Sequence, residues 1–409
     1  MSERKPKTKV ASSAPRSSQP KRSTKSTFFT CSTLIGVVLS VVAALLLTHL
    51  FVKSPIDAVS FTMPDPPDLI DDVRLAQSEI HLNDQIYGPE SIAVHPTTGK
   101  IYTGLKTGLI CEIEMVKNKA KIVRGLKLTS LDGCDGGYHN MEKCGRPLGM
   151  RFNKDDELIV VDAYLGVFAI DWTKEKVHKI LSGGAQLEEV DQPPVRYLND
   201  LDFLPDGRIV LTESSTKFDD KDFLWDLFEH RPNGRVLLLN PKNGAISLLA
   251  DNLYFPNGVQ VWRGKVIVAE MGMARIVKIS PSSGDVTVLI DNLAGYPDSV
   301  RKSADGKLWI PLAAPRTSQD NWLNERARLR EIMTKVLSPQ ALQLVVDQFT
   351  PAIAVVHKFD PENGKILDTL MDKSQKIVSI SSVVEDLDGN LLFGSDANYY
   401  LGRLVKSNF

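Results

Sequence analysis

The feature of this sequence that most constrains its fold is a short pattern that recurs six times. In the clearest copy, an apolar strand follows Phe255, a glycine turn lies at Gly264, and a strand rich in Val and Ile precedes Glu270. The six copies begin at Gly88, Gly145, Asn199, Phe255, Tyr296 and Ser381. Most copies are roughly 40 to 60 residues apart, which is room for three or four short strands each. The chain is therefore expected to repeat one antiparallel β unit six times.

Six such units predict an all-β fold, a six-bladed β-propeller. A solenoid of βα repeats would show a similar period, but helical periodicity is missing between most copies. Two stretches do carry helical signals, at 219–230 in the third blade and at about 317–349 in the fifth. In the second stretch, Ser338 and Pro339 are typical of the N-cap and first turn of a helix. This helical insertion could form a lid, contact a membrane, or simply pack on its blade.

Ahead of the repeats, composition divides the chain into three parts. Residues 1–27 are rich in Ser, Pro, Lys and Arg and are expected to be a disordered basic tail in the cytoplasm. Residues 28–52 belong to a run of 27 residues without a formal charge, which is long enough to span a bilayer as a signal anchor. Residues 53–80 carry several prolines and are expected to form a stalk. The propeller then occupies 81–409.

The charges around the apolar run predict how the chain is oriented. Basic residues precede the run, so the tail should stay in the cytoplasm and the propeller should be lumenal or extracellular. A cleaved signal peptide is the alternative, but the leader is long and no small-residue cleavage site follows it. The prediction is a single-pass type II protein of the plasma membrane or the endoplasmic reticulum.

The cysteines and the net charge narrow the range of partners. Cys134 and Cys144 flank a Gly-rich loop and are expected to pair as a disulfide if that loop is lumenal or extracellular. A zinc site is the rival, but two cysteines and His139 fall short of a ligand set. Cys111 lies in a strand-like run and is expected to be a buried free thiol. The net charge of −1, with no basic patch outside the tail, argues against nucleic-acid binding.

Four copies of the pattern place an oxygen-bearing side chain at one register, seven to nine residues before the turn glycine: Glu90, Asn199, Asn257 and Asp298. Leu148 and Ser381 hold this position in the other two copies. Because the position opens the innermost strand of a blade, the four side chains should point into the central channel. Two carboxylates and two amide carbonyls suit Ca²⁺, suit Mg²⁺ less well and argue against zinc. The simpler alternative is that Asn-Asp and Asn-Gly are ordinary turn dipeptides.

Several segments together carry a family resemblance: Glu90, Asn199-Asp200, 255–259, 296–298, 144–149 and 161–164. With them the chain resembles the strictosidine synthase-like branch of the calcium-dependent phosphotriesterase superfamily, from the apolar run to Leu404. The resemblance implies a six-bladed propeller with a metal ion in its channel and activity toward aryl esters. In regucalcin and the paraoxonases, more distant relatives, a Glu, Asn and Asp set at equivalent blade positions binds the metal.

The sequence also departs from this family's pattern at two places. Strictosidine synthases rely on a Glu near the start of the sixth inner strand to handle protons when an amine condenses with an aldehyde. The run 378–382 has no acid, and the first one to follow it is Glu385. Paraoxonases use a His pair above the metal, and here only His139 and His81 are candidates for the channel mouth. Synthase-type condensation is therefore the least favoured of the predicted activities.

The chemistry that remains is calcium-dependent hydrolysis of small esters or lactones, with arylesterase-type activity. Calcium acidifies bound water only modestly, so a general base is still needed. Asp298 is the candidate for ligand and base together, with Asp200 in reserve, although a turn-capping role is the simpler interpretation of Asp200. No Gly-x-Ser-x-Gly motif is present, which disfavours a serine hydrolase. The alternative is a non-catalytic propeller that binds a ligand or a partner and holds a structural calcium ion.

Overall fold

The computed structural model describes residues 25–409, although the side chains of 25–32, 45, 46 and 48–50 are not described. The chain divides into two compact units, Met1–Lys53 and Ser54–Phe409. The first unit contains α1 (Lys25–Phe51). Within the described residues, no helix is both long and apolar enough to cross a membrane. The anchor at 28–52 remains a prediction, and most of the predicted tail, 1–27, lies outside the described residues.

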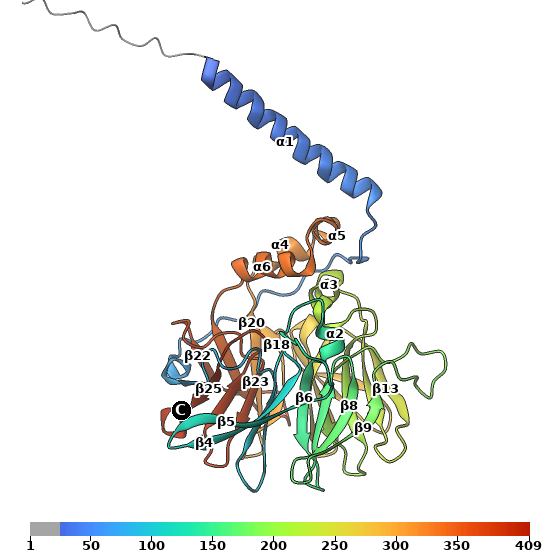
Figure 1. Ribbon diagram of the computed structural model, residues 1–409, viewed down its shortest axis with the longest axis vertical. Coiled ribbons are helices and arrows are strands. Elements are labelled where there is room, and N and C mark those ends of the chain that lie inside the picture. The colour runs from blue at the N-terminus through green and yellow to red at the C-terminus, as the bar shows by residue number, and fades with distance from the viewer. Residues whose placement is uncertain (1–24) are drawn as a thin grey trace, which may run out of the picture. The chain divides into compact units, whose positions relative to one another are not determined.

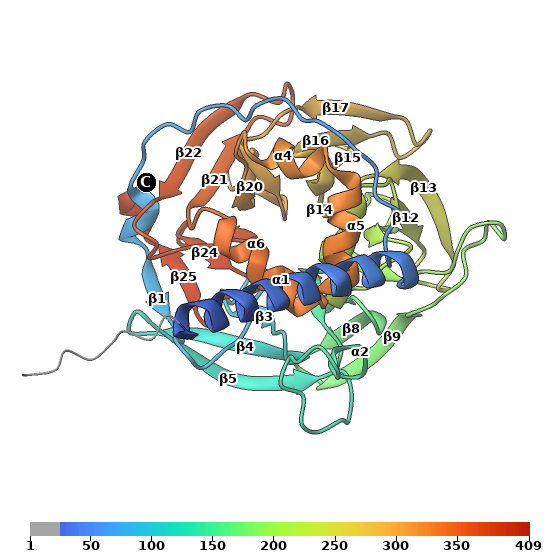
Figure 2. The same cartoon turned by 90° about the horizontal axis from the view of Figure 1, so that it is seen from above.

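Six antiparallel sheets in the second unit form a closed ring, which confirms the predicted all-β, six-bladed propeller (Figure 2). The first blade contains β2 (Ile92–Val94), β3 (Ile101–Gly104), β4 (Leu109–Val116) and β5 (Lys119–Lys127). The second contains β6 (Pro147–Phe152), β7 (Leu158–Asp162), β8 (Gly166–Asp171) and β9 (Lys176–Ser182). The third contains β10 (Tyr197–Phe203), β11 (Ile209–Ser215), β12 (Gly234–Leu239) and β13 (Ile246–Leu253).

The remaining blades follow the same order from the inner to the outer strand. The fourth contains β14 (Pro256–Trp262), β15 (Lys265–Glu270), β16 (Arg275–Ile279) and β17 (Val286–Ile290). The inner edge of the fifth is split into β18 (Gly295–Pro297) and β19 (Arg301–Lys302), both paired with β20 (Leu308–Pro315), and β21 (Ala354–Phe359) and β22 (Ile366–Asp372) follow. The sixth contains β23 (Ser382–Glu385), β24 (Leu391–Gly394), β25 (Leu401–Leu404) and β1 (Glu79–His81).

The sixth blade closes the ring with a strand from the other end of the propeller sequence. β1 pairs antiparallel with β25, so that Glu79 lies opposite Arg403, and these two side chains also form an ion pair. The first and last strands of the propeller are thereby held in one sheet. Closure of this kind leaves no open seam between the first and last blades, which removes an edge at which the ring could come apart.

The sequence forms these blades because its strands are apolar on both faces near the centre and polar at the rim. In β7, all five residues from Leu158 to Asp162 are buried. The outermost strand β5, in contrast, alternates exposed and partly buried residues along its length. Neighbouring blades share their cores, as where Val161 of the second blade and Leu211 of the third belong to one apolar cluster. Polar side chains on the inner strands are therefore exceptions to the surrounding pattern.

The two predicted helical insertions lie at one end of the ring (Figure 1). The third blade contributes α3 (Phe223–Glu229), preceded by the 3-10 turn η2 (Asp220–Asp222). The fifth contributes α4 (Asp320–Asn324), α5 (Ala327–Val336) and α6 (Pro339–Phe349). Ser338 caps α6, because its hydroxyl accepts a hydrogen bond from the Ala341 amide. The insertions are thus helical as predicted.

Shorter helical elements and a disulfide complete the fold. These elements are α2 (Met141–Cys144), η1 (Arg74–Gln77), η3 (Met271–Met273) and η4 (Lys406–Asn408). Cys134 is bonded to Cys144, which confirms the predicted disulfide. Cys111 is fully buried and free, also as predicted. The disulfide closes the Gly-rich loop that leads into the second blade.

The segment between Ser54 and η1, which the sequence suggests as part of a stalk, runs along the propeller and contacts it repeatedly. Ile56 is buried in a cluster with side chains of α3 and α6. The ring of Phe61 stacks on His230, and Arg74 pairs with Asp368 on β22. These contacts attach the start of the second unit to the propeller, rather than leaving it as a free spacer.

Candidate metal centre

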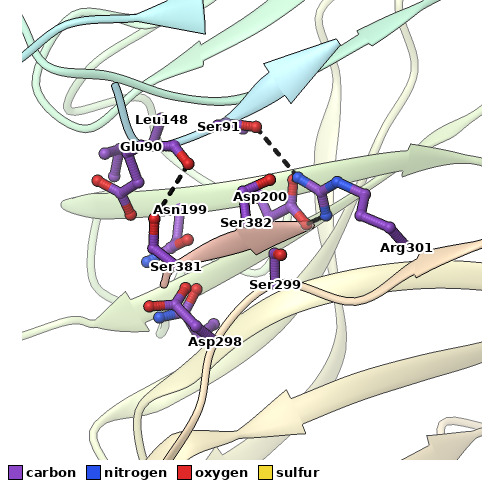
Figure 3. A pocket seen from close by; sticks show the side chains of 12 residues that line it. Glu90, Ser91, Leu148, Asn199, Asp200, Asp298, Ser299, Arg301, Ser381 and Ser382 are labelled. Carbon is purple, nitrogen blue, oxygen red and sulfur yellow. Dashed lines mark hydrogen bonds and ion pairs between the residues drawn. The ribbon is translucent and has the colours of Figure 1, made fainter. Parts of the chain in front are cut away.

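The structure brings the four predicted oxygen donors around one cavity. Glu90, Asn199, Asn257 and Asp298 line it together, each contributed by a different blade (Figure 3). The cavity measures about 10 Å³, which is room for a single water-sized particle. Leu148 and Ser381, from the remaining two blades, complete the ring of lining residues. The position that repeats in the sequence therefore converges on a space suited to one ion.

The two asparagines belong to strands, so the alternative that they form ordinary turns is wrong. Asn199 lies within β10 and Asn257 within β14. Gly258 follows Asn257 because the chain approaches its neighbour closely there: a Cβ at Gly258 would lie 2.4 Å from the Cα of Ser299. The Asn-Gly pair thus reflects packing between β14 and the segment that links β18 to β19.

Hydrogen bonds from the amide nitrogens orient both asparagines with their oxygens free. The Asn199 Nδ2 donates to the Ser214 hydroxyl at 3.1 Å, and Ser214 in turn donates to the Pro256 carbonyl. The Asn257 Nδ2 lies 4.0 Å from the sulfur of Met271. Among the described residues, no donor contacts either Oδ1 atom. Both amide oxygens are therefore available as ligands.

The two carboxylates of the site differ in their partners. One oxygen of Glu90, Oε2, accepts a hydrogen bond from the buried Arg146 guanidinium at 2.7 Å, which leaves Oε1 without a protein donor. The carboxylate of Asp298 has no donor at all within the described part of the chain. A buried carboxylate without a partner is costly, so Asp298 favours a cation or a proton in its place.

The pKa values of Glu90 and Asp298 also favour a cation or a proton in the cavity. Burial raises the pKa of Glu90 to about 7, although the nearby Arg146 acts against this rise. Burial also raises the pKa of Asp298 well above its ordinary value, and the negative charges of Glu90 and Asp396 add to the effect. A positive ion between these carboxylates would reverse both trends, because it stabilises the ionised forms.

Asp200, the reserve candidate for the general base, also lines the cavity and is held by arginine side chains. Arg301 donates to both of its oxygens, at 2.7 and 3.2 Å, and the Val259 amide donates to one of them. Burial alone would raise the pKa of Asp200, but Arg301 and Arg151 lower it below its usual value. Asp200 is thus kept ionised as a structural carboxylate, and Asp298 is the better candidate base.

Three serines at the cavity were not identified as site residues from the sequence. Ser299 and Ser382 line it, and their buried hydroxyls have no hydrogen-bond partner within the part of the chain that the structure describes. Ser91 also lines it and accepts a hydrogen bond from Arg301. Each follows a register position directly, after Asp298, Ser381 and Glu90, and this spacing is the signal that could have revealed them. Unpartnered buried hydroxyls are suited to holding ordered water.

The donor set fits a hard cation. It offers oxygen atoms from two carboxylates and two amides, with hydroxyls close by, which is the chemistry that Ca²⁺ prefers. Among the described residues, no three His, Cys, Asp or Glu side chains are grouped so as to hold a metal ion. Binding here would therefore depend on the amide oxygens of Asn199 and Asn257, and zinc remains disfavoured.

An apolar cluster adjoins the cavity and shares one of its lining residues, Leu148. Leu148, Tyr197 and Phe255 form a buried cluster, and Phe223 and Leu227 of α3 pack against it. On its other side, α3 packs against α5 and α6 through a second apolar cluster. The helix α3 is therefore held between the propeller and the fifth-blade insertion, and it packs against the cluster that contains Leu148, a residue that lines the candidate metal centre.

Polar contacts at the base of α3 hold it in place. Asp226 is buried and accepts hydrogen bonds from the Ser215 hydroxyl and the Asn233 side chain. Burial raises the pKa of Asp226 to about 7, against the effect of these hydrogen bonds. The folded protein therefore keeps the proton up to about pH 7, whereas the unfolded chain releases it near pH 4. This stabilising contribution is complete below about pH 4 and is lost as the pH rises to about 7.

Asp226→Asn should remove this pH dependence. We expect the difference in the free energy of unfolding, variant minus wild type, to increase by about 2 kcal/mol as the pH rises from 5 to 7. Urea denaturation at several pH values measures the change. Asp388→Asn, at an exposed turn carboxylate, is the matched control. A constant difference between Asp226→Asn and wild type across this range would contradict the expectation.

The acid and the two histidines that the family resemblance singles out do not line the cavity. Glu385 accepts hydrogen bonds from the Trp309 indole and the Ala304 amide, and neither it nor His139 lines the cavity. His81 lies in β1, the outermost strand of its blade, so the suggestion that it is near the channel mouth is wrong. The sixth blade contributes Ser381 and Ser382 to the cavity, and no acid.

Comparison with known proteins identifies the family. The adipocyte plasma membrane-associated protein of Bos taurus is 33% identical over 368 residues, which covers 86% of this chain and 85% of that protein. The chain belongs to this family. The Salmo salar member is 30% identical over 89% of this chain and 87% of its own length. The Arabidopsis thaliana protein strictosidine synthase-like 3 is also 30% identical, over 78% of this chain and 83% of that protein.

Family models and solved structures agree with the propeller. The strictosidine synthase model matches residues 199–280, and the strictosidine synthase-like N-terminal model matches 73–113. These two matches include three of the four oxygen donors, Glu90, Asn199 and Asn257. A gluconolactonase from Xanthomonas campestris has a similar fold, with a TM-score of 0.52 and 15% sequence identity, over 86% of this chain and 98% of that protein.

Proposed function

We propose that the protein is a calcium-dependent hydrolase of small esters or lactones. The observation that carries the proposal is the convergence of four oxygen donors, two of them carboxylates, on a cavity that has room for one ion. Glu90, Asn199, Asn257 and Asp298 would hold the ion. The gluconolactonase with the similar fold, a lactone hydrolase by name, supports this class of substrate.

The chain's own residues divide the chemistry between them. When bound, a calcium ion supplies a positive charge that polarises a carbonyl group and offsets the negative charge that develops on its oxygen. Asp298 accepts the proton of the attacking water, because its carboxylate has no other donor to hold it. Ser214 and Met271 contact the Nδ2 atoms of the two asparagines, so both amide oxygens would be free to bind the ion. Arg301 and Asp200 form a buried ion pair that also lines the cavity.

The test is hydrolysis of phenyl acetate and of a simple lactone by the full chain in detergent, with calcium and with a chelator. We expect turnover with calcium and a loss of at least tenfold in chelator, restored by added calcium. Unfolding in urea under both conditions separates loss of the fold from loss of the ion. Turnover that is equal with and without chelator would exclude a calcium-dependent mechanism.

A second function is favoured by one specific observation. The cavity has room for an ion and none for a substrate, and Phe223 and Leu227 pack against the apolar cluster that includes its lining residue Leu148. A binding propeller with a structural calcium ion would need no such room. The double variant Phe223→Ala with Leu227→Ala separates the two functions. The turnover rate of a hydrolase should rise once these side chains are removed, whereas a protein with a structural site should show only a lower free energy of unfolding.

We also propose that the protein is held at a membrane by the run 28–52, with the propeller lumenal or extracellular. The absence of formal charge in this run and the basic residues ahead of it support this topology. The names of the relatives, plasma membrane-associated proteins, support the location. The disulfide between Cys134 and Cys144 is consistent with an oxidising compartment.

Synthase-type condensation of an amine with an aldehyde has less support. That chemistry needs a proton-handling group at the cavity, and the sixth blade presents only hydroxyls there, from Ser381 and Ser382. The hydroxyl of Ser381 donates to the Glu90 carbonyl and is thereby engaged. Glu385, the next acid along the chain, is engaged by Trp309.

A further inference from the structure

We propose that the outer face of α4–α6 is a lipid-contacting surface, through which the propeller lies against a bilayer. We call this surface the cap face and define it by its exposed apolar side chains: Trp322, Val336, Leu344 and Phe349. The helices that carry it are inserted between β20 and β21 and lie at one end of the ring (Figure 1). Contact with lipid is separate from ester hydrolysis and is measured by tryptophan quenching.

The cap face carries the two most exposed aromatic residues of 54–409, whereas Tyr399 of the sixth blade is exposed elsewhere. Trp322 is 58% exposed and Phe349 is 82% exposed. Within residues 54–409, no other Trp or Phe is more than about a third exposed. The Arg326 guanidinium lies over the Trp322 ring, 4.5 Å from its centroid. A tryptophan paired with a cation is suited to the boundary between lipid headgroups and acyl chains.

In α6, apolar residues lie at exposed as well as at packed positions, although Gln340, Asp347 and Gln348 are exposed beside them. The inner side of the cap helices is already satisfied, because Leu342, Met333 and Leu323 pack with α3 in a common cluster. The outer residues Leu344 and Phe349 make no contribution to that cluster, and Leu344 is 71% exposed. A helix with apolar residues on both faces is typical of one that is covered on both faces. Side chains of α3 cover the inner face, so the apolar residues of the outer face would be covered only by something outside the unit, such as lipid.

The position at which the chain joins the propeller unit favours a bilayer as the cover of the outer face. Ser54, the first residue of the unit, lies 3.4 Å from Thr334 on α5 through their hydroxyl oxygens, and Ile56 is buried beside α6. The chain that precedes Ser54 therefore leaves the unit at the cap helices. That preceding chain is the uncharged run that ends at Val52. Only Lys53 separates this run from Ser54, so a bilayer that holds the run is tethered to the unit at the cap helices.

Charge does not drive this contact. Residues 317–350 contain four Lys or Arg and four Asp or Glu, so the insertion has no net charge. Apolar burial must therefore supply the attraction, and neutral lipids should suffice. A surface that depended on anionic headgroups would instead carry an excess of basic residues.

The experiment is tryptophan quenching in the full chain, reconstituted into neutral phosphatidylcholine vesicles with or without brominated acyl chains. Bromine quenches only tryptophans in contact with it, and Trp322 is one of five in the chain. We expect the brominated lipid to remove on the order of one fifth of the wild-type emission, and Trp322→Phe to abolish this loss. Equal quenching of wild type and Trp322→Phe, or no quenching of either, would overturn the proposal.

A matched pair of variants tests the apolar contact itself. Leu344→Glu with Phe349→Glu places charge on the cap face, and we expect at least half of the quenching to be lost. Val286→Glu with Val288→Glu is the control, because these residues are 40% and 50% exposed on the outer strand β17. Quenching that both pairs reduce equally, or that neither reduces, would overturn a specific cap face. Ester hydrolysis in the same vesicles is scored separately, so failure of the proposed function leaves this result intact.

Discussion

Asp298→Asn is expected to lower calcium-dependent ester hydrolysis by about 100-fold or more, because it removes a ligand charge and the proposed general base together. The change preserves the size of the side chain, so the cavity and its neighbours should keep their packing. Steady-state hydrolysis of phenyl acetate by the full chain measures the effect. Removing the carboxylate also takes away one of the negative charges at the cavity, which Glu90 and Asp200 line as well.

The same variant should lose the stabilisation that calcium confers on the fold. A ligand at 100 times its Kd stabilises the native state by about 2.7 kcal/mol, and urea unfolding with and without calcium measures this difference. Asp388→Asn is the control, because that carboxylate is exposed at a turn of the sixth blade. If Asp298→Asn kept both its activity and its calcium-dependent stabilisation, the assignment of Asp298 would be wrong.

The register of the repeat is what made the site predictable from the sequence. A propeller places equivalent positions of its inner strands around one axis, so polar residues at one register must face each other. Glu90, Asn199, Asn257 and Asp298 line one cavity for this reason. The disulfide and the helix cap at Ser338 were predictable too, because both depend on short stretches of chain.

The parts that were not predictable depend on contacts between distant segments. The orientation of Asn257 depends on Met271, which lies on the short turn η3, and that of Asn199 depends on Ser214. The prolines of 53–80 predicted a stalk of extended backbone but not its contacts, because a single side chain such as Ile56 finds its partners only once α3 and α6 are in place. No local pattern in the sequence carries that information.

The buried ion pair between Arg301 and Asp200 is expected to contribute strongly to the free energy of unfolding. Arg301 and Asp200 have side chains only 6% and 3% exposed, and both residues, which share two hydrogen bonds, line the cavity. Arg301→Met should therefore lower the free energy of unfolding by about 3–5 kcal/mol, because it leaves the Asp200 carboxylate buried and poorly compensated. Arg151, the remaining cation, is 3.6 Å from Asp200. Urea unfolding in chelator measures this cost without any contribution from bound calcium.

A double variant separates the orphaned charge from the lost packing. Arg301→Met with Asp200→Asn removes both charges, so it should be more stable than Arg301→Met alone, by about 1 kcal/mol or more. Arg208→Met is the matched control, because the Arg208–Asp206 pair is 40% and 51% exposed and should contribute less than about 1 kcal/mol. If Arg301→Met lowered the free energy of unfolding no more than Arg208→Met does, the expected contribution of the Arg301–Asp200 pair would be contradicted. The buried pair would then stabilise the fold no more than a surface contact does.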